Sequence, residues 1–119
     1  MPIDGMADCI FCKIVSGDIP AEIVASSETA IAFRDVNPQA PTHVQIIPRK
    51  HVAHITDFDA GTDTDWLSGL FDLANQVARD EGLDKGFRLV INNGPLAGQS
   101  VFHVHLHILG GRGLGWPPG

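Results

Sequence analysis

The sequence lacks most features of an exported, membrane-bound or polyanion-binding protein. Two cysteines among 119 residues are too few for a disulfide framework. No apolar run approaches the roughly 18 residues of a membrane span, and residues 1–8 carry acid where a signal peptide would carry positive charge. Eight lysines and arginines against fourteen acids give a net charge of -6, with no basic patch for a nucleic acid polymer. We therefore expect a cytoplasmic protein with no membrane or nucleic acid partner. The net charge of -6 is still compatible with binding a small phosphate compound.

The composition is that of one folded domain. The chain is 44% hydrophobic and 18% charged, and a chain of this length buries roughly two thirds of the surface that its unfolded form exposes. Repeats, linkers and low-complexity tracts are absent from the sequence. We expect a single domain over residues 1–119, with residues 1–8 as a flexible N-terminus.

Hydrophobic periodicity predicts five strands and one long helix. Alternation of apolar and polar residues indicates strands at 22–25, 29–35, 43–47, 87–91 and 101–109. Between residues 62 and 81 the apolar residues recur at helical spacing, and Gly82 is placed to end that helix. Consecutive strands with one long helix across them predict an α+β fold, a five-stranded antiparallel sheet with one long and one short helix.

The segment GQSVFHVHLHIL carries three of the six histidines, His103, His105 and His107, at alternate positions. On a strand the three rings would share one face about 6.6 Å apart, while Phe102, Val104, Leu106 and Ile108 face the core. Three explanations are open: a packed or solvated face, a catalytic zinc site, or nucleophilic catalysis by one imidazole tuned by its neighbours.

Residues next to the histidines favour nucleophilic catalysis at phosphorus. Gln99 and Ser100 directly precede the row, and Gly94 and Gly98 would let backbone N–H groups approach an anion closely. An unprotonated imidazole nitrogen can attack phosphorus and form a phosphoramidate. Nucleotidyl or phosphoryl transfer is therefore the reaction class that these residues indicate.

The motif HVHLHIL matches the signature of the histidine-triad (HIT) family of nucleotide hydrolases and transferases. IFCKI, DVNPQAPTH, GQSVFHVHLH and the terminal GGRGLGWPPG extend the resemblance from Cys9 to Gly119. The WPPG ending resembles the Hint branch, the purine nucleoside phosphoramidases, rather than the Fhit-like or uridylyltransferase branches. Two departures stand out: Gln45 replaces a usual aliphatic residue, and Gly113-Leu114-Gly115 replaces a bulkier stretch, which affects leaving-group selectivity more than the chemistry.

The resemblance implies a role for each matching residue. His105 would attack the α-phosphorus of an adenosine phosphoramidate and form a nucleotidyl-histidine that water hydrolyses, with His107 on the α-phosphate and with His43 and His103 as the supporting polar shell. No cofactor is implied for catalysis. The residues implied for binding the purine nucleotide are Ile10, Phe11, Ile14 and Val36 around the base, Asp35 on the ribose, Asn92, Gly98, Gln99 and Ser100 near the phosphate, and Trp116 in the tail. The apolar members also suit a plain core position, and Asp35 also suits a turn cap.

Cys9 and Cys12 form a Cys-x-x-Cys motif near the N-terminus. A thioredoxin-like redox motif normally lies between a strand and a helix of a βαβ unit, which this position does not suggest. In histidine-triad proteins that carry this motif, zinc is completed by residues matching His51 and His103, so the resemblance implies a closed, structural Cys₂His₂ site. Two small buried thiols without a metal are the alternative. His54 is expected at the surface.

Two other functions stay open from the sequence. One is a nucleotide-binding or scaffold protein with incidental turnover, and the other is a zinc-dependent hydrolase that uses the triad as ligands.

The wide apolar stripe of the 62–81 helix, which includes Trp66 and Phe71, exceeds what one small sheet needs to cover it. We therefore expect a two-fold homodimer, as the Hint resemblance also implies, with the tail 110–119 at the partner's active site.

Overall fold

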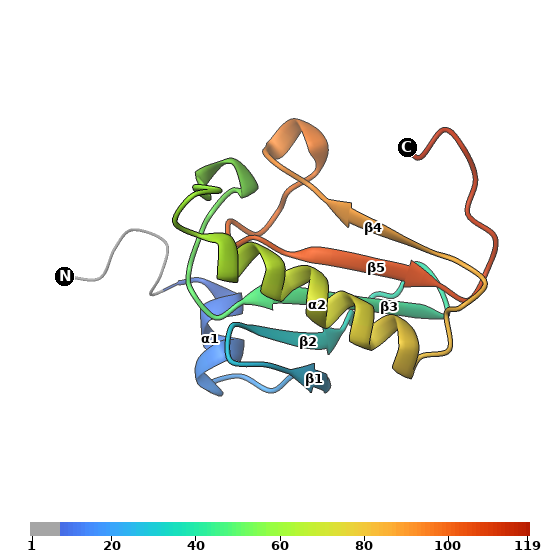
Figure 1. Cartoon of the computed structure of the whole chain (residues 1–119), viewed down its shortest axis with the longest axis horizontal. Helices are drawn as coiled ribbons and strands as arrows, with labels where there is room; N and C mark the ends of the chain where they lie inside the picture. The colour runs from blue at the N-terminus through green and yellow to red at the C-terminus, as the bar shows by residue number, and fades with distance from the viewer. Residues whose placement is uncertain (1–7) are drawn as a thin grey trace.

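The computed structural model describes residues 8–119. The flexible terminus predicted over residues 1–8 lies, apart from Asp8, outside the described residues. Five strands form one sheet in the order β1-β2-β3-β5-β4, with every neighbouring pair antiparallel (Figure 1). The strands are β1 (Ile23–Ser26), β2 (Ala30–Arg34), β3 (Thr42–Pro48), β4 (Phe87–Ile91) and β5 (Leu106–Gly110). The helices are α1 (Ile10–Ser16), α2 (Thr64–Asp80) and the short 3-10 helices η1 (Ile55–Asp57) and η2 (Pro95–Ala97). The predicted α+β fold is confirmed.

Helix α2 covers one face of the sheet (Figure 1). Its buried residues pack on the inward side chains of β2, β3 and β5; they are Leu70, Leu73, Ala74, Val77 and Ala78. Gly82 has φ +69°, and the Leu83 N–H donates to the Ala78 carbonyl at 2.9 Å, so the helix ends where the glycine predicts. Trp66 is only half-buried and Phe71 is 42% exposed, so part of the apolar stripe is left uncovered by the chain itself.

Helix α1 covers the opposite face of the sheet. Its buried residues Phe11 and Ile14 pack in a second cluster with Ile31, Phe33 and Ile47. Cys9 is the N-cap, its Sγ accepting from the Cys12 N–H at 3.3 Å. The Cys-x-x-Cys motif therefore does open a helix, but within residues 8–119 no strand precedes it, so it does not form the βαβ setting of a redox motif.

The fifth strand is shorter than the sequence predicts. Its ladder begins at Leu106, which pairs with Ile46, and residues 101–105 lie outside it. The neighbouring strand β3 ends at Pro48, and the Val104 N–H bonds instead to the Val52 carbonyl at 2.7 Å, beyond the end of β3. The predicted alternation nevertheless extends past the ladder, because Val104, Leu106 and Ile108 are all buried in the core under α2. Phe102 does not follow it and is 47% exposed.

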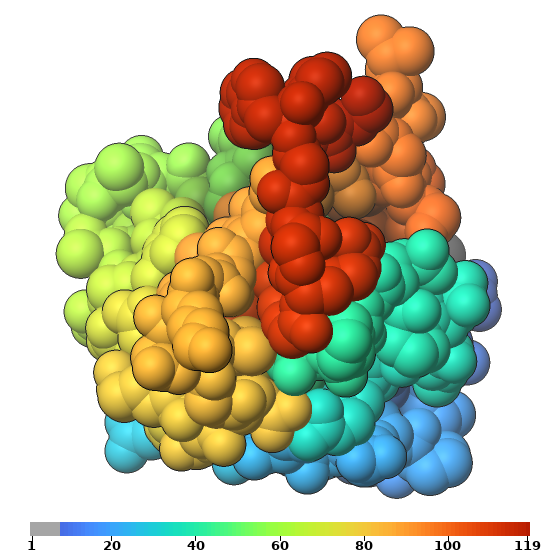
Figure 2. Space-filling view, turned by 90° about the vertical axis from the view of Figure 1, so that its right-hand side faces the viewer, coloured from blue at the N-terminus to red at the C-terminus, as the bar shows by residue number. Residues whose placement is uncertain are grey.

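No helix within residues 8–119 is long and apolar enough to cross a membrane. The C-terminal segment after Gly110 leaves the sheet and projects from the body of the molecule (Figures 1 and 2). Arg88 of β4 donates to the Gly115 carbonyl at 2.7 Å and holds the base of this tail.

Candidate active site

The loop before the triad is braced from within. Gly94 and Gly98 adopt φ values of +89° and +95°, which glycine tolerates without strain. Gln99 is buried, and its Oε1 accepts from the Gly94 N–H at 2.7 Å, while its Nε2 donates to the Ala53 and Val101 carbonyls at 2.7 and 3.1 Å. Its own N–H donates to the Gly94 carbonyl. Gln99 was predicted to contact the substrate; since its amide groups are used inside the protein, it holds the loop instead.

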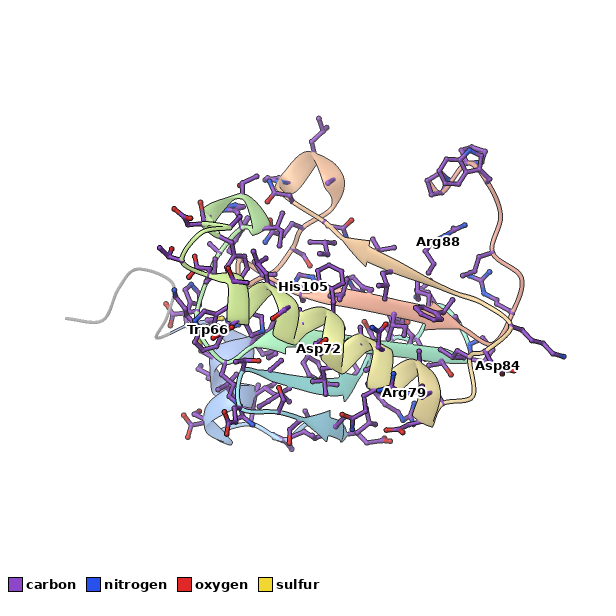
Figure 3. All side chains as sticks on the ribbon, in the orientation of Figure 1. Trp66, Asp72, Arg79, Asp84, Arg88 and His105 are labelled. Atoms are coloured by element: carbon purple, nitrogen blue, oxygen red, sulfur yellow. The ribbon has the colours of Figure 1, made fainter. Side chains whose placement is uncertain are left out.

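His105 lies just before β5 and is 6% exposed (Figure 3). Its Nδ1 lies 2.9 Å from the His103 carbonyl oxygen. A carbonyl can only accept, so Nδ1 carries the hydrogen, and in the neutral ring Nε2 keeps a free lone pair. The edge of the Phe11 ring packs against this imidazole, with 5.1 Å between ring centroids. The geometry thus leaves the Nε2 lone pair of His105 available.

His43 and His107 form a second hydrogen-bonded pair, 2.8 Å between His43 Nε2 and His107 Nδ1. The Gln39 N–H donates to His43 Nδ1 at 3.0 Å, so His43 must carry its hydrogen on Nε2 and donate it to His107. His107 in turn carries its hydrogen on Nε2. The rings of His107 and His105 are neighbours, with 5.0 Å between their centroids.

Burial keeps both supporting rings neutral. Desolvation, followed by the neighbouring His105 and His43 imidazoles, lowers the pKa of His107 from 6.5 to about 4. Burial also lowers the pKa of His43, although the nearby Asp35 carboxylate opposes the change. A neutral His107 can donate a hydrogen bond from its Nε2–H. It carries no positive charge that would repel a positively charged His105 ring.

A cavity of about 250 Å³ opens between α1 and β2, next to the histidines. The predicted base-contacting residues Ile10, Phe11, Ile14 and Val36 line it together with Asp35. Ile10 is 48% exposed and Val36 fully exposed at its rim, while Phe11 and Ile14 are buried in its wall. Phe11 also contacts the His105 ring, so one side chain joins this wall of the cavity to His105.

His103 faces away from this cavity and into the cysteine cluster. It is fully buried, its Nε2 lies 2.8 Å from the Pro48 carbonyl, and its Nδ1 lies 3.4 and 3.5 Å from the sulfurs of Cys9 and Cys12. The backbone carbonyl of His103, rather than its ring, reaches His105. The His103 imidazole, which the sequence predicts in the supporting polar shell, therefore faces the cysteines, because the chain turns its ring into the core beneath α1.

Cys9, Cys12, His51 and His103 place four ligand atoms within 4.8 Å of one another. Cys12 Sγ lies 3.1 Å from His51 Nδ1, and a tetrahedral zinc with sulfur and nitrogen ligands sets them about 3.5 Å apart. The Pro48 carbonyl leaves the His103 Nδ1 lone pair free for a metal, as partners beyond the ligands do in zinc sites. The four residues fit a closed, structural zinc ion. Burial and the adjacent Cys9 raise the pKa of Cys12 to about 11, so without a cation its thiol stays protonated.

A second group, Asp35, His43 and His107, also brings ligand atoms within 4.8 Å. It does not suit a metal, because His43 would have to release the Nε2 hydrogen that the Gln39 N–H fixes there. The three triad imidazoles do not converge on one point either, since His103 is committed to the cysteines. The geometry therefore does not support a zinc hydrolase with the triad as ligands.

Other predicted residues lie at the edges of the site. Ser100 is exposed and Asn92 half-exposed on the two loops beside the triad. Trp116 is 84% exposed in the tail, which begins at the opposite end of β5 from His105. His54 is half-buried rather than a free surface residue; it stacks near Phe102 at 5.6 Å.

Sequence patterns did not reveal the residues that fix the tautomers. Gln39 and Pro48 act through a backbone N–H and a backbone carbonyl, groups that every residue or nearly every residue carries. Gln45 was noted only as a departure from the family pattern. In the structure its Nε2 donates to Asp35 Oδ2 at 2.7 Å, inside the cavity.

The comparisons with known proteins agree with this arrangement. A family profile of the HIT domain matches residues 16–114. A HIT family hydrolase from Legionella pneumophila has a TM-score of 0.89 and 49% identity, over 93% of this chain and 99% of that one. An uncharacterised HIT-like protein of Synechocystis is 52% identical over 114 residues, which are 94% of this chain and 97% of the relative. A 14 kDa zinc-binding protein of Brassica juncea is 46% identical over 113 residues, 94% of this chain and all of the relative. The chain belongs to the HIT family.

Proposed function

We propose that the protein is a nucleoside phosphoramidase of the Hint type, which hydrolyses the phosphorus–nitrogen bond of adenosine 5′-phosphoramidates. The observation that carries the proposal is the hydrogen bond from His105 Nδ1 to the His103 carbonyl at 2.9 Å. It leaves a free lone pair on Nε2 of His105, and the Phe11 ring that packs against this imidazole also lines the cavity proposed for the purine. Nucleophilic histidine catalysis needs this combination of a neutral ring and a bound phosphorus centre.

The reaction proceeds in two displacements. His105 Nε2 donates its electron pair to the α-phosphorus while the P–N bond breaks, and the departing amine keeps its electron pair and takes up a proton. The His103 carbonyl stabilises the imidazolium that forms, because it accepts from Nδ1 throughout. His107 Nε2–H donates to a phosphate oxygen. Water then attacks phosphorus and releases a proton to the solvent, the bond to His105 breaks with its electron pair returning to Nε2, and the nucleoside monophosphate leaves.

The remaining predicted contacts arrange the substrate along the cavity. Ile10, Phe11, Ile14 and Val36 enclose the base, and Asp35 binds the ribose hydroxyls. Asn92, Ser100 and the backbone at Gly98 face the phosphate and the leaving group, where donors would stabilise developing charge. Glycine at 98 suits this role because no side chain blocks an anion from its N–H.

We also propose that Cys9, Cys12, His51 and His103 hold a structural zinc ion. Their donor set and spacing support it, and two relatives are named zinc-binding proteins, from Brassica juncea and Zea mays. The metal would tie α1 to the segment before β5. These residues would thereby keep the His103 carbonyl beneath the His105 ring.

A two-fold dimer completes the proposal. β4 is an edge strand of the sheet, and Phe87 on it and Phe71 on α2 are 38% and 42% exposed. A cavity of about 400 Å³ adjoins Phe87 and is lined by residues of the C-terminal half of α2 and by Leu83. Pairing of this face in a second copy would cover the apolar groups and bring each tail toward the partner's site.

Incubation with adenosine 5′-phosphoramidate tests the reaction. We expect hydrolysis by the wild type and a loss of several orders of magnitude in His105→Ala. His54→Ala, a histidine outside the site, should retain activity and serves as the control. During turnover, mass spectrometry should find one adenylyl group on the peptide that contains His105.

Three outcomes would contradict the proposal. Equal rates for wild type and His105→Ala would remove the nucleophile, and an adenylyl group on another residue would reassign it. Tight AMP binding without turnover would favour the nucleotide-binding or scaffold alternative. Loss of activity on brief chelation, with the fold intact by circular dichroism, would favour zinc catalysis.

A further inference from the structure

Gln45 is a polar side chain on the floor of an otherwise largely apolar cavity. Strand register pairs it with Phe33 of β2 on one side and with His107 of β5 on the other. Directly paired residues of neighbouring strands share one face of a sheet. Gln45 therefore lies between the wall proposed for the base and the histidine proposed for the phosphate, which is the position of the sugar in a nucleotide.

Its amide fixes the carboxylate of Asp35. Gln45 Nε2 donates to Asp35 Oδ2 at 2.7 Å, and the Asn37 N–H donates to Oδ1 at 2.8 Å. The side chain of Asp35 is 14% exposed, so it remains accessible from the cavity. With one lone pair of each oxygen used by the protein, one on each oxygen stays available for a ligand.

Among the described residues, no other side chain is placed to donate a hydrogen bond to Asp35 Oδ2. His43 Nε2 lies 3.4 Å from Asp35 Oδ2, but its one hydrogen is directed to His107 at the shorter distance of 2.8 Å. An aliphatic residue at position 45 would leave Oδ2 without a close donor. The carboxylate would then be held through Oδ1 alone and could rotate about its terminal torsion.

We propose that Gln45 is a positioning residue that orients Asp35 for the vicinal hydroxyls of a ribose, and so makes the site selective for ribonucleotides. This inference rests on the proposed function, because it assumes that the cavity binds a nucleotide. Gln45 acts through Asp35: the two free lone pairs, held in one plane, accept from the 2′- and 3′-hydroxyls together. A freely turning carboxylate accepts from them less well.

Binding of AMP and of 2′,3′-dideoxy-AMP, measured by calorimetry, separates sugar recognition from the rest of the site. Gln45→Met keeps the length of the side chain and removes its donor, and Gln45→Glu keeps its shape and places an acceptor against Asp35. For AMP we expect the Kd to rise about tenfold in Gln45→Met, the loss of one hydrogen bond to a charged group, and further in Gln45→Glu. For the dideoxy ligand the Kd should stay within about twofold.

Two controls make the result specific. Gln76→Met changes the same residue type on the exposed face of α2 and should leave both ligands unaffected. In an Asp35→Asn background, Gln45→Met should cause no further loss, because its effect passes through the carboxylate. Circular dichroism checks that each variant is folded.

Failure of the inference and failure of the proposed function give different results. If the wild type prefers AMP but Gln45→Met weakens both ligands equally, or neither, Gln45 has no positioning role while nucleotide binding stands. If the wild type binds neither ligand, the proposed function is wrong and this inference with it. Equal wild-type affinity for the two ligands would show that Asp35 does not bind the sugar.

Discussion

The tautomers of His105 and His43 are each set by a backbone group that can only donate or only accept, and His43 in turn sets the tautomer of His107. The His103 carbonyl places the hydrogen of His105 on Nδ1, and the Gln39 N–H places that of His43 on Nε2. Side chains that could both donate and accept would leave the choice open. The backbone thus fixes which nitrogen of the neutral His105 ring keeps its lone pair.

The lowered pKa of His107 predicts a loss of stability in mild acid. Below about pH 6.5 the unfolded chain takes up a proton on this residue, whereas the folded ring stays neutral down to about pH 4. The unfolded state therefore binds more protons between about pH 6.5 and pH 4. The contribution of His107 to the free energy of unfolding is complete above this range, and it falls by up to about 3 kcal/mol as the pH drops through the range. Urea unfolding at pH 7 and pH 5 measures the change.

A variant at His107 tests whether this ring causes the loss of stability in mild acid. His107→Asn should be less stable than the wild type at pH 7 yet show a smaller difference between the two pH values. His54→Asn, at a more accessible histidine, should keep the wild-type difference. An unchanged pH dependence in His107→Asn would mean that other groups carry it.

At the scale of elements, α1 depends on contacts outside itself. It has only seven residues, too few for a stable isolated helix. Its first turn carries Cys9 and Cys12, and Phe11 between them contacts His105. The proposed zinc ion would thus stabilise the helix and the position of the nucleophile together.

Replacing both Cys9 and Cys12 by serine tests this connection. Serine caps a helix at least as well as cysteine, so any loss reports the metal rather than the cap. We expect no zinc by elemental analysis and a free energy of unfolding lower by on the order of 3 kcal/mol or more. Wild-type protein that is purified with zinc present and still contains none would contradict the assignment, as would an unchanged stability of the double variant.

The sequence predicts the regular elements better than the segments between them. Helix α2 and strand β4 lie close to where the sequence predicts them, at Thr64–Asp80 and Phe87–Ile91, and the apolar stripe of the helix is buried on one side. The strand predicted over residues 101–109 is too long, since alternation records which face a residue takes and not whether a neighbouring strand is present. Loss of the ladder before Leu106 depends on Pro48, more than 50 residues earlier in the chain.

The same limit applies to the site. The family resemblance supplied the roles predicted for His105, His107 and His43 and the ligand set of Cys9, Cys12, His51 and His103. Spacing alone left three explanations open for the triad histidines. In the structure, the ring of His103 turns toward the sulfurs and Gln99 braces a loop, and both outcomes depend on tertiary contacts from residues 48, 53 and 94.

At the scale of the whole molecule, the tail is exposed in the single chain, and the role proposed for it depends on the proposed dimer. Figure 2 shows it standing out from the body, and Trp116 within it is 84% exposed. Deleting residues 113–119 should change the preference between leaving amines more than the affinity for AMP, because the tail would reach the partner's leaving-group side. Competition kinetics with two phosphoramidates of different amines, beside AMP calorimetry, measure the two effects.

Light scattering at micromolar concentration tests the dimer that this prediction requires. A mass near twice the 12.7 kDa of the chain is expected. A species of about 13 kDa would rule out a contribution from a partner's tail. Phe71→Glu should shift the mass toward the monomer, whereas Glu substitution of an exposed polar residue on α2, Gln76→Glu, should not.

The alternation through Val104, His105, Leu106, His107 and Ile108 places core and site on opposite sides of one short run. Inserting or deleting a single residue there would exchange the two sides, sending imidazoles under α2 and aliphatic chains toward the substrate. Such a slip would unfold the protein before it could alter its chemistry. Selection for a stable fold therefore also preserves the alignment of the nucleophile, and length variation in this run is closed to the protein as a route to a new activity.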